Sequence, residues 1–189
     1  MMKYTSFLFY FVLLAVTQAV CFAQTHLIIA DQGKSTFTLV IPAEAPASVR
    51  AAALELQKDI QLSTGASLIL RNDRAPTNGP IISLGATVQA QKEGISFSDL
   101  AEDSFRIVTT NGNLYIGGPD TADEKWTTNG GTSNGTANGV YTFLEDYLDV
   151  RWLMPGNIGR DVPYKSTFII DNINRTETPL FMQRNEPYI

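Results

Sequence analysis

The 189-residue sequence has very little of the side-chain chemistry on which hydrolytic and metal-dependent sites rely. It holds one cysteine, Cys21, and one histidine, His26. A structural zinc site draws its four ligands mainly from cysteine and histidine, and a cysteine nucleophile needs a base beside it. We therefore expect no catalytic, metal-binding or cofactor-binding residue in this chain, and no cofactor.

Basic side chains are also scarce. Lysine and arginine total 14 against 19 aspartates and glutamates, which gives a net charge of −5, and no basic run occurs anywhere. Binding to nucleic acid depends on clusters of lysine and arginine that neutralise phosphates. The composition thus excludes nucleic acid as a partner and fits a soluble, acidic domain.

The N-terminal residues 1–23 have the pattern of a secretory signal peptide. Lys3 precedes an apolar run over residues 7–16, and Ala23 supplies the small residue at the expected cleavage position. A membrane anchor and lipidation of Cys21 are the competing interpretations, but the run ends at Thr17, short of the roughly 20 residues that span a bilayer. We expect a secreted or periplasmic protein that has no membrane contact and no disulfide after cleavage.

Residues 25–171 read as one domain of strands and helices. Apolar runs at residues 27–29 and 37–41 flank a turn at 31–34 and predict a hairpin. The spacing of the apolar side chains predicts a helix that ends at Gly65, with strands at 67–71 and 81–84 and a short helix at 86–92 after it. Alternation at 104–109 and 114–116 around Asn111-Gly112 predicts a second hairpin.

The next segment, residues 117–139, is rich in glycine, threonine and asparagine and predicts a long loop. Its carboxylates, Asp120, Asp123 and Glu124, do not have the spacing of a calcium loop, so we interpret them as solvated charges. Long loops in small domains often carry function or move, and this one is where we expect a ligand or a neighbouring domain to bind. A surface excursion without function is the equal alternative.

The chain beyond this loop begins with an amphipathic helix at residues 140–148, followed by apolar residues 150–153 and a stop at Pro155-Gly156. A last strand is expected at 166–170 and a polar linker at 172–179. Helices and strands in this irregular order predict an α+β fold, in which a mixed, mainly antiparallel sheet packs with helices as a two-layer or three-layer sandwich.

Acidic and aromatic side chains offer few alternatives to this non-catalytic interpretation. Glu145 and Asp149 lie one helical turn apart, whereas the two carboxyls of a glycosidase face each other across the substrate. Trp126, in the long loop, is the better candidate for stacking on a sugar ring. Trp152 follows the amphipathic helix directly, so packing in the core or between domains is the favoured role for it.

Several separated segments together resemble a known domain. They are the helix with the sequence AAALELQ that closes at STGA (residues 51–57 and 63–66), the strand ending IGG (116–118), and the segment NGVYTFLEDYL followed by VRW (138–148 and 150–152). Their order and spacing resemble the non-catalytic N-terminal domain of bacterial glycoside hydrolases, of the α-glucuronidase N-terminal type and the related hexosaminidase domain. The resemblance covers nearly all of the mature chain.

The resemblance implies an accessory domain that precedes a (β/α)₈ catalytic barrel in an enzyme of polysaccharide degradation. Residues 172–189 would then be a linker and the start of that barrel, and the chain would be a fragment that is inactive alone. Arg151, Trp152 and Arg184 are the predicted contacts with the barrel, because interfaces favour aromatic and arginine anchors. The alternative is a self-sufficient carbohydrate-binding module that binds polysaccharide through Trp126.

Overall fold

The computed structural model describes residues 26–180, with the exception of the side chain of residue 157. The predicted signal peptide and Arg184 lie outside the described residues, so both remain predictions. Within residues 26–180, no helix combines the length and the apolar character that crossing a membrane would require.

The main feature of the fold is a six-stranded mixed sheet with the strand order β10-β5-β6-β4-β2-β3. The pairings β3-β2, β2-β4 and β4-β6 are parallel, and β6-β5 and β5-β10 are antiparallel. The strands are β2 (Thr38–Ile41), β3 (Ile69–Asn72), β4 (Ile81–Leu84), β5 (Phe105–Thr110), β6 (Asn113–Gly117) and β10 (Asn174–Glu177).

Two short antiparallel pairs lie outside this sheet. Strand β1 (His26–Asp31) pairs with β9 (Thr167–Asp171), and β7 (Arg151–Trp152) pairs with β8 (Arg160–Asp161). A short 3₁₀ helix, η1 (Asn157–Gly159), lies between β7 and β8. The mixed strand directions and the helices confirm the predicted α+β class.

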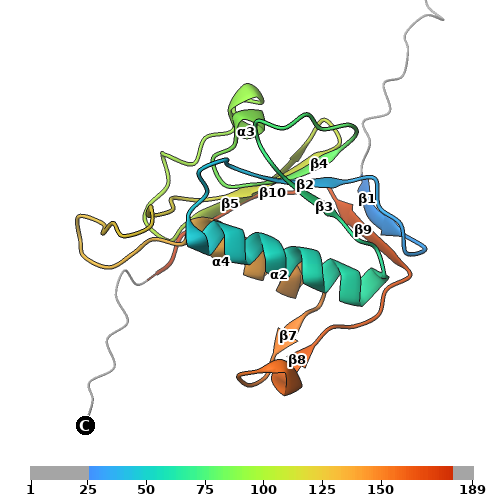
Figure 1. The fold of residues 1–189 in the computed structure, drawn as a ribbon. Helices are drawn as coiled ribbons and strands as arrows, with labels where there is room; N and C mark the ends of the chain where they lie inside the picture. The colour runs from blue at the N-terminus through green and yellow to red at the C-terminus, as the bar shows by residue number, and fades with distance from the viewer. Residues whose placement is uncertain (1–25, 181–189) are drawn as a thin grey trace, which may run out of the picture.

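Two helices cover one face of the six-stranded sheet, as Figure 1 shows, and a third lies on the opposite side. Helices α2 (Ala47–Thr64) and α4 (Gly135–Tyr147) pack on each other and on the sheet, and α3 (Val88–Lys92) belongs to the other layer. The side chains of β2 alternate accordingly: Leu39 joins the large core beneath α2 and α4, and Val40 joins a smaller core on the α3 side.

The sequence pattern predicts helix α2 and its end correctly. Its buried side chains include Val49, Leu56 and Ile60, which follow the helical spacing. Gly65 ends the helix with φ at +78°, and its N–H donates to the carbonyl of Gln61. A residue in this left-handed conformation is commonly glycine, because a Cβ would be strained there.

The hairpin of β5 and β6 is also confirmed. Asn111 and Gly112 both have positive φ, at 49° and 76°, and they join Thr110 to Asn113 across the turn. A two-residue turn with both residues in this conformation matches the twist of the strands that it joins, and Asn-Gly adopts it most readily.

The predicted hairpin of residues 27–29 and 37–41 is wrong. The chain does turn tightly at Asp31 to Lys34, where each backbone N–H donates to the other residue's carbonyl. After this turn the chain leaves β1 and enters the main sheet as β2, between β3 and β4. The partner of β1 is β9, more than 130 residues later, and local turn signals carry no information about such a pairing.

The predicted polar linker at 172–179 is wrong for residues 174–177, which form the edge strand β10 on β5. Arg175 fixes this strand to helix α4, because its guanidinium contacts Asp146 at 2.6 Å and also pairs with Glu177. These carboxylates raise the pKa of Arg175 above its usual value. The domain therefore extends past the predicted boundary at residue 171.

Candidate functional site

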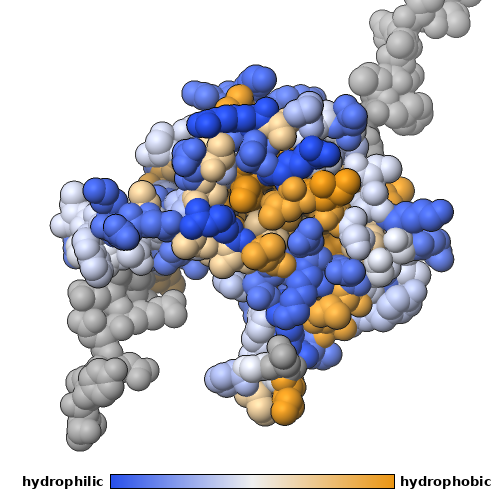
Figure 2. Space-filling view, in the orientation of Figure 1, coloured by the Kyte–Doolittle hydropathy of each residue, from blue (hydrophilic) through white to orange (hydrophobic). Residues whose placement is uncertain are grey.

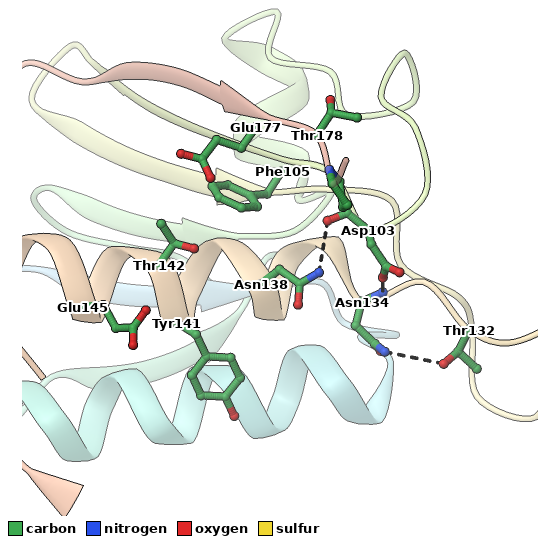
Figure 3. A pocket seen from close by; sticks show the side chains of 11 residues that line it. Asp103, Phe105, Thr132, Asn134, Asn138, Tyr141, Thr142, Glu145, Glu177 and Thr178 are labelled. Carbon is green, nitrogen blue, oxygen red and sulfur yellow. Dashed lines mark hydrogen bonds between the residues drawn. The ribbon is translucent and has the colours of Figure 1, made fainter. Parts of the chain in front are cut away.

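A groove of about 780 Å³ lies between helix α4 and the strands β5 and β10. Figure 3 shows it from close by. Most of its lining is polar. The lining residues come from α4, the two strands and the three segments that lead into β5, into α4 and out of β10: Asp103, Phe105, Thr132, Asn134, Asn138, Tyr141, Thr142, Glu145, Glu177, Thr178 and Pro179.

The end of the groove nearest the long loop is held by a network around Asp103. Its carboxylate accepts the N–H of Asn134 at 2.8 Å, and its carbonyl accepts the side-chain amide of Asn138 at 3.0 Å (Figure 3). The N–H of Asp103 in turn donates to the hydroxyl of Ser133. The first N–H groups of α4 are thus partly satisfied by a carboxylate of the chain itself.

Asp120 caps the same helix end from the long loop. One of its carboxylate oxygens accepts the N–H of Thr136 at 3.0 Å, and the other accepts the Thr136 hydroxyl at 2.5 Å. Desolvation raises the pKa of Asp120 above its usual value, although both hydrogen bonds from Thr136 oppose that rise. The interpretation of Asp120 as a solvated loop charge is therefore wrong.

We expect Asp120→Asn to reduce the free energy of unfolding by about 1–2 kcal/mol, because one buried hydrogen bond is lost. The Thr136 hydroxyl already accepts the N–H of Gly118 at 3.2 Å, so it needs an acceptor for its own proton. If the substituted asparagine still accepts the Thr136 N–H through its amide oxygen, its NH₂ group faces the Thr136 hydroxyl. An NH₂ group cannot accept the hydroxyl proton, so that hydrogen bond is lost. Urea unfolding measures the loss, and Glu124→Gln, an exposed change in the same loop, is the control. An equal effect of the two changes would contradict the capping role.

The loop also caps the other long helix. Asp123 accepts the N–H of Ala47, the first residue of α2, at 2.7 Å, and it pairs with Arg50 at 3.0 Å. The hydrogen bond from Ala47 is the main reason that the pKa of Asp123 is lowered, and Arg50 adds to it. Asp123 is exposed to solvent, as expected, but it also caps α2, so the loop joins the N-termini of both helices.

Glu145 and Asp149 have different surroundings. Glu145 lines the groove, whereas Asp149 pairs with the ammonium of Lys165 at 2.7 Å. The hydrogen bond from Lys165 lowers the pKa of Asp149. Asp149 is not among the residues that line this groove.

Trp126, the predicted sugar contact, lies in the long loop with 77% of its surface exposed. The turn after it is closed by hydrogen bonds between Thr127 and both Gly130 and Gly131. Trp126 does not line the groove of Figure 3. Its exposure is what a stacking platform requires, and its binding role remains a prediction.

Arg151 and Trp152, the predicted interdomain contacts, lie on β7 at the end of α4. Arg151 is exposed, and its guanidinium donates to the carbonyls of Glu145 and Val150 at 2.7 and 2.9 Å. Trp152 is half-buried, packs on the main core and meets Tyr141 edge to face at a ring-centroid distance of 5.4 Å. Trp152 is therefore partly a core residue, and the contact of both side chains with another domain remains a prediction.

Among residues 26–180, no group of three or more histidine, cysteine, aspartate or glutamate side chains is arranged to hold a metal ion. Sequence reasoning missed the groove, because its lining residues are up to 76 positions apart, from Asp103 to Pro179, and only the sheet brings them together. A partial signal was present in the helical spacing of Asn134, Asn138, Tyr141 and Glu145, which places these side chains along one side of α4.

No protein-family model matches the sequence, and a search of curated proteins finds no match. Solved structures with a similar chain path include the glycoside hydrolase BtGH115A, a family GH115 4-O-methyl-α-glucuronidase with specificity for decorated arabinogalactans (TM-score 0.49, 18% identity over 82% of this chain). Another is the GH20 β-N-acetylhexosaminidase of Streptomyces coelicolor A3(2) (TM-score 0.47, 12% identity over 84% of this chain). The chain spans 18% and 24% of the lengths of these two enzymes.

Proposed function

We propose that the chain is an accessory, non-catalytic domain of a secreted enzyme of polysaccharide degradation, where it packs against a (β/α)₈ catalytic domain. The observation that carries the packing role is an exposed apolar tip on the hairpin of β7 and β8. The motif resemblance of residues 138–152 supports the carbohydrate context, and the pattern of residues 1–23 supports secretion through a cleaved signal peptide.

The apolar tip consists of Leu153, Met154 and Ile158, which are 75%, 58% and 95% exposed. The hairpin projects away from the helices in Figure 1, and apolar surface lies at its lower end in Figure 2. Isolated apolar side chains on a surface are ordinary, but three large ones at the end of one projection are typical of a contact surface. Such a tip has the shape and chemistry to enter a hollow on a neighbouring domain.

Backbone hydrogen bonds close the tip. The N–H of Leu153 donates to the carbonyl of Gly159 at 2.7 Å, and that of Gly159 donates to Gly156 at 3.3 Å. Gly159 packs so tightly on Met154 that a Cβ there would lie 2.1 Å from the Met154 carbonyl oxygen. A tip with a fixed backbone loses less conformational entropy when it binds.

The groove of Figure 3 supports the same assignment. Thr178 and Pro179, which line it, follow directly after the edge strand β10. Any domain joined closely to this strand would begin beside the groove. Residues of α4 line the groove, and the β7–β8 hairpin lies on the side of the sheet that α2 and α4 cover (Figure 1). The polar part of the interface would then come from Glu145, Glu177 and the side-chain amide of Asn138. Polar groups are expected there because the rim of a protein interface is normally polar.

The proposal is tested with the tip variant Leu153→Ser, Met154→Ser, Ile158→Ser. We expect its free energy of unfolding to change by less than about 0.5 kcal/mol per substitution, because these side chains are exposed. Its affinity for the separately produced catalytic domain, measured by sedimentation, should fall at least about tenfold. Val88→Ser, which removes an exposed apolar side chain on the α3 side, should leave both quantities unchanged.

Two results would overturn the proposal. One is a parent reading frame that continues after Ile189 without a catalytic domain, and the other is binding that the tip variant leaves unchanged. Release of sugar by the isolated chain would separately show that it is catalytic.

The alternative function is a carbohydrate-binding module, and the exposure of Trp126 is the observation that favours it. In that case the purified chain should be retained on insoluble polysaccharide, and Trp126→Ala should abolish the retention without loss of folding. Retention that survives this substitution would count against Trp126 as the platform.

A further inference from the structure

A second hollow, of about 520 Å³, lies between helix α2 and the base of the β7–β8 hairpin. Its lining is Glu55, Lys58, Tyr141, Trp152, Gly156 and Arg160. Ligand-binding clefts in proteins have volumes of roughly 300–1,000 Å³. Tyr141 is common to this hollow and to the groove of Figure 3, but the other residues that line the two differ.

The polar wall of this pocket is a cluster of charges that neutralise one another. Arg160 Nη2 lies 2.5 Å from Glu55 Oε2 and also pairs with Oδ1 of Asp59, which is fully buried behind it. Lys58 is on the same helix and lines the pocket beside them. With two cations and two carboxylates, the formal charge of the cluster is zero, so neither an anion nor a cation is attracted by a surplus of charge.

One donor of the cluster is left over. Glu55 Oε2 and Arg160 Nη2 already face each other in the ion pair, whereas the buried Nε of Arg160 has no hydrogen-bond partner. The side chains of Glu55 and Arg160 are still 34% and 11% exposed. A buried donor without a partner is rare in folded proteins, and a hydroxyl group of a ligand would accept from this Nε after a small adjustment of the side chains.

The apolar wall is an aromatic corner. Tyr141 and Trp152 meet at an interplanar angle of 86°, so the edge of one ring faces the plane of the other. Tyr141 is 39% exposed, and Trp152 is half-buried. Aromatic rings provide apolar area against which the C–H groups of a sugar ring pack, and the indole N–H and phenol O–H add hydrogen bonds at the rim.

From this combination we infer that the pocket between α2 and the hairpin binds a neutral saccharide unit, with Trp152 and Tyr141 as the apolar wall and Glu55 and Arg160 as hydrogen-bonding groups. A sugar presents hydroxyl groups, which donate to a carboxylate and accept from a guanidinium, and carries no charge that the balanced cluster would oppose. The inference goes beyond the packing role, because it requires neither the apolar tip nor the groove at β10.

The test uses the two tryptophans separately. The sequence contains only Trp126 and Trp152, so Trp126→Phe leaves Trp152 as the sole tryptophan and Trp152→Phe leaves Trp126. Both proteins are titrated with soluble gluco-, xylo- and galacto-oligosaccharides, and with an oligogalacturonide as a charged comparison, while tryptophan emission is recorded. We expect at least one neutral oligosaccharide to give a saturable change in the protein that retains Trp152 and a stronger response than the oligogalacturonide.

Glu55→Gln tests the polar wall. In the Trp126→Phe protein it should weaken saccharide binding by about tenfold, because a charged acceptor becomes an amide. Tyr141→Phe, which keeps the ring and removes the hydroxyl, should weaken binding without loss of folding. The matched control is Glu44→Gln, an exposed change before α2, and circular dichroism confirms that each variant is folded.

Three results would overturn the inference: no response of Trp152 to any neutral oligosaccharide, an unchanged affinity in both Glu55→Gln and Tyr141→Phe, or a preference for the charged oligosaccharide. A response that appears only in the protein that retains Trp126 would also overturn it and would place binding in the long loop. None of these outcomes depends on the tip variant, so failure of the packing proposal would be recognised separately.

Discussion

Gly135→Ala should be one of the most destabilising single substitutions in this domain, with an expected loss of about 3 kcal/mol from the free energy of unfolding. Gly135 is the first residue of α4, and a Cβ there would lie 2.3 Å from the carbonyl oxygen of Ser104 and 2.9 Å from the Cα of Gly118. Both contacts are backbone atoms, which cannot rotate away as the end of a side chain does. To accommodate the methyl group, α4 would have to move away from the segments before β5 and after β6.

The matched control is Gly94→Ala, because a Cβ at Gly94 meets nothing within 4 Å. The only expected cost at Gly94 is the roughly 1–2 kcal/mol that a residue with a Cβ loses in a left-handed conformation, because φ is +72° there. Urea unfolding of both variants measures the difference. Equal losses would mean that α4 can move at its N-terminus and that the close approach of Gly118 and Gly135 does not constrain the fold.

The importance of Gly135 also shows how a local pattern can mislead. In the sequence, Gly130 and Gly135 look like parts of a flexible connection, rich in glycine and polar residues. In the structure, Gly130 has open space around it, whereas Gly135 lies against two other segments of backbone. Composition does not distinguish a glycine needed for close packing from a glycine in a free turn, because only the folded chain supplies the neighbour.

Elements whose determinants are local could be predicted. The face of α2, its end at Gly65 and the turn at Asn111-Gly112 depend on residues within a few positions of each other. The pairing of β1 with β9 and the addition of β10 to the sheet depend on partners far away in the chain. The partners in both pairings lie more than 60 positions apart in the chain, and the periodicity of a short segment carries no information about so distant a partner.

The candidate sites were harder to predict for the same reason. The exposure of Trp126 was expected from its polar surroundings in the loop, and the structure shows it exposed. Asp120 and Asp123 were both interpreted as solvated charges. Asp123 is exposed and Asp120 is partly buried, and each caps a helix that the loop reaches only in the folded protein. Glu55 and Asp59 have the same one-turn spacing as any pair of surface acids. Only the folded chain brings Arg160, about 100 residues away, between Glu55, which lines the pocket, and Asp59, which is buried behind it.

Arg160→Met is expected to lower the free energy of unfolding by about 3–5 kcal/mol at neutral pH, because it leaves a buried carboxylate without its partner. Asp59 has 0% of its side chain exposed, so water cannot replace the guanidinium. Arg160 also joins β8 to α2, and its loss would loosen the hairpin from the helix. If Asp59 is changed to Leu in the same protein, most of the stability should return, since an apolar pair of similar size carries no desolvation cost.

The loss should depend on pH in a direction that the pKa of Asp59 determines. Desolvation raises this pKa above its ordinary value even with Arg160 present, and Glu55 adds to the rise while Arg160 and Lys58 oppose it. A raised pKa in the folded state means that the folded protein holds the proton more tightly than the unfolded chain does. The contribution of Asp59 to stability is therefore greatest below its unfolded pKa of about 3.9 and decreases as the pH rises through the folded value.

Removing Arg160 takes away the group that most opposes this rise, so the pKa of Asp59 in Arg160→Met should be higher still. At low pH, Asp59 is protonated in both proteins, and the two should then differ mainly by the packing of the side chain. Above the folded pKa of the variant, its Asp59 is ionised without a partner, and the difference in free energy of unfolding between the two proteins reaches its full size. Urea unfolding at roughly pH 4 and pH 7 should thus give a smaller loss at the lower pH. A loss of the same size at both values would mean that Arg160 stabilises the hairpin through packing and not through the charge of Asp59.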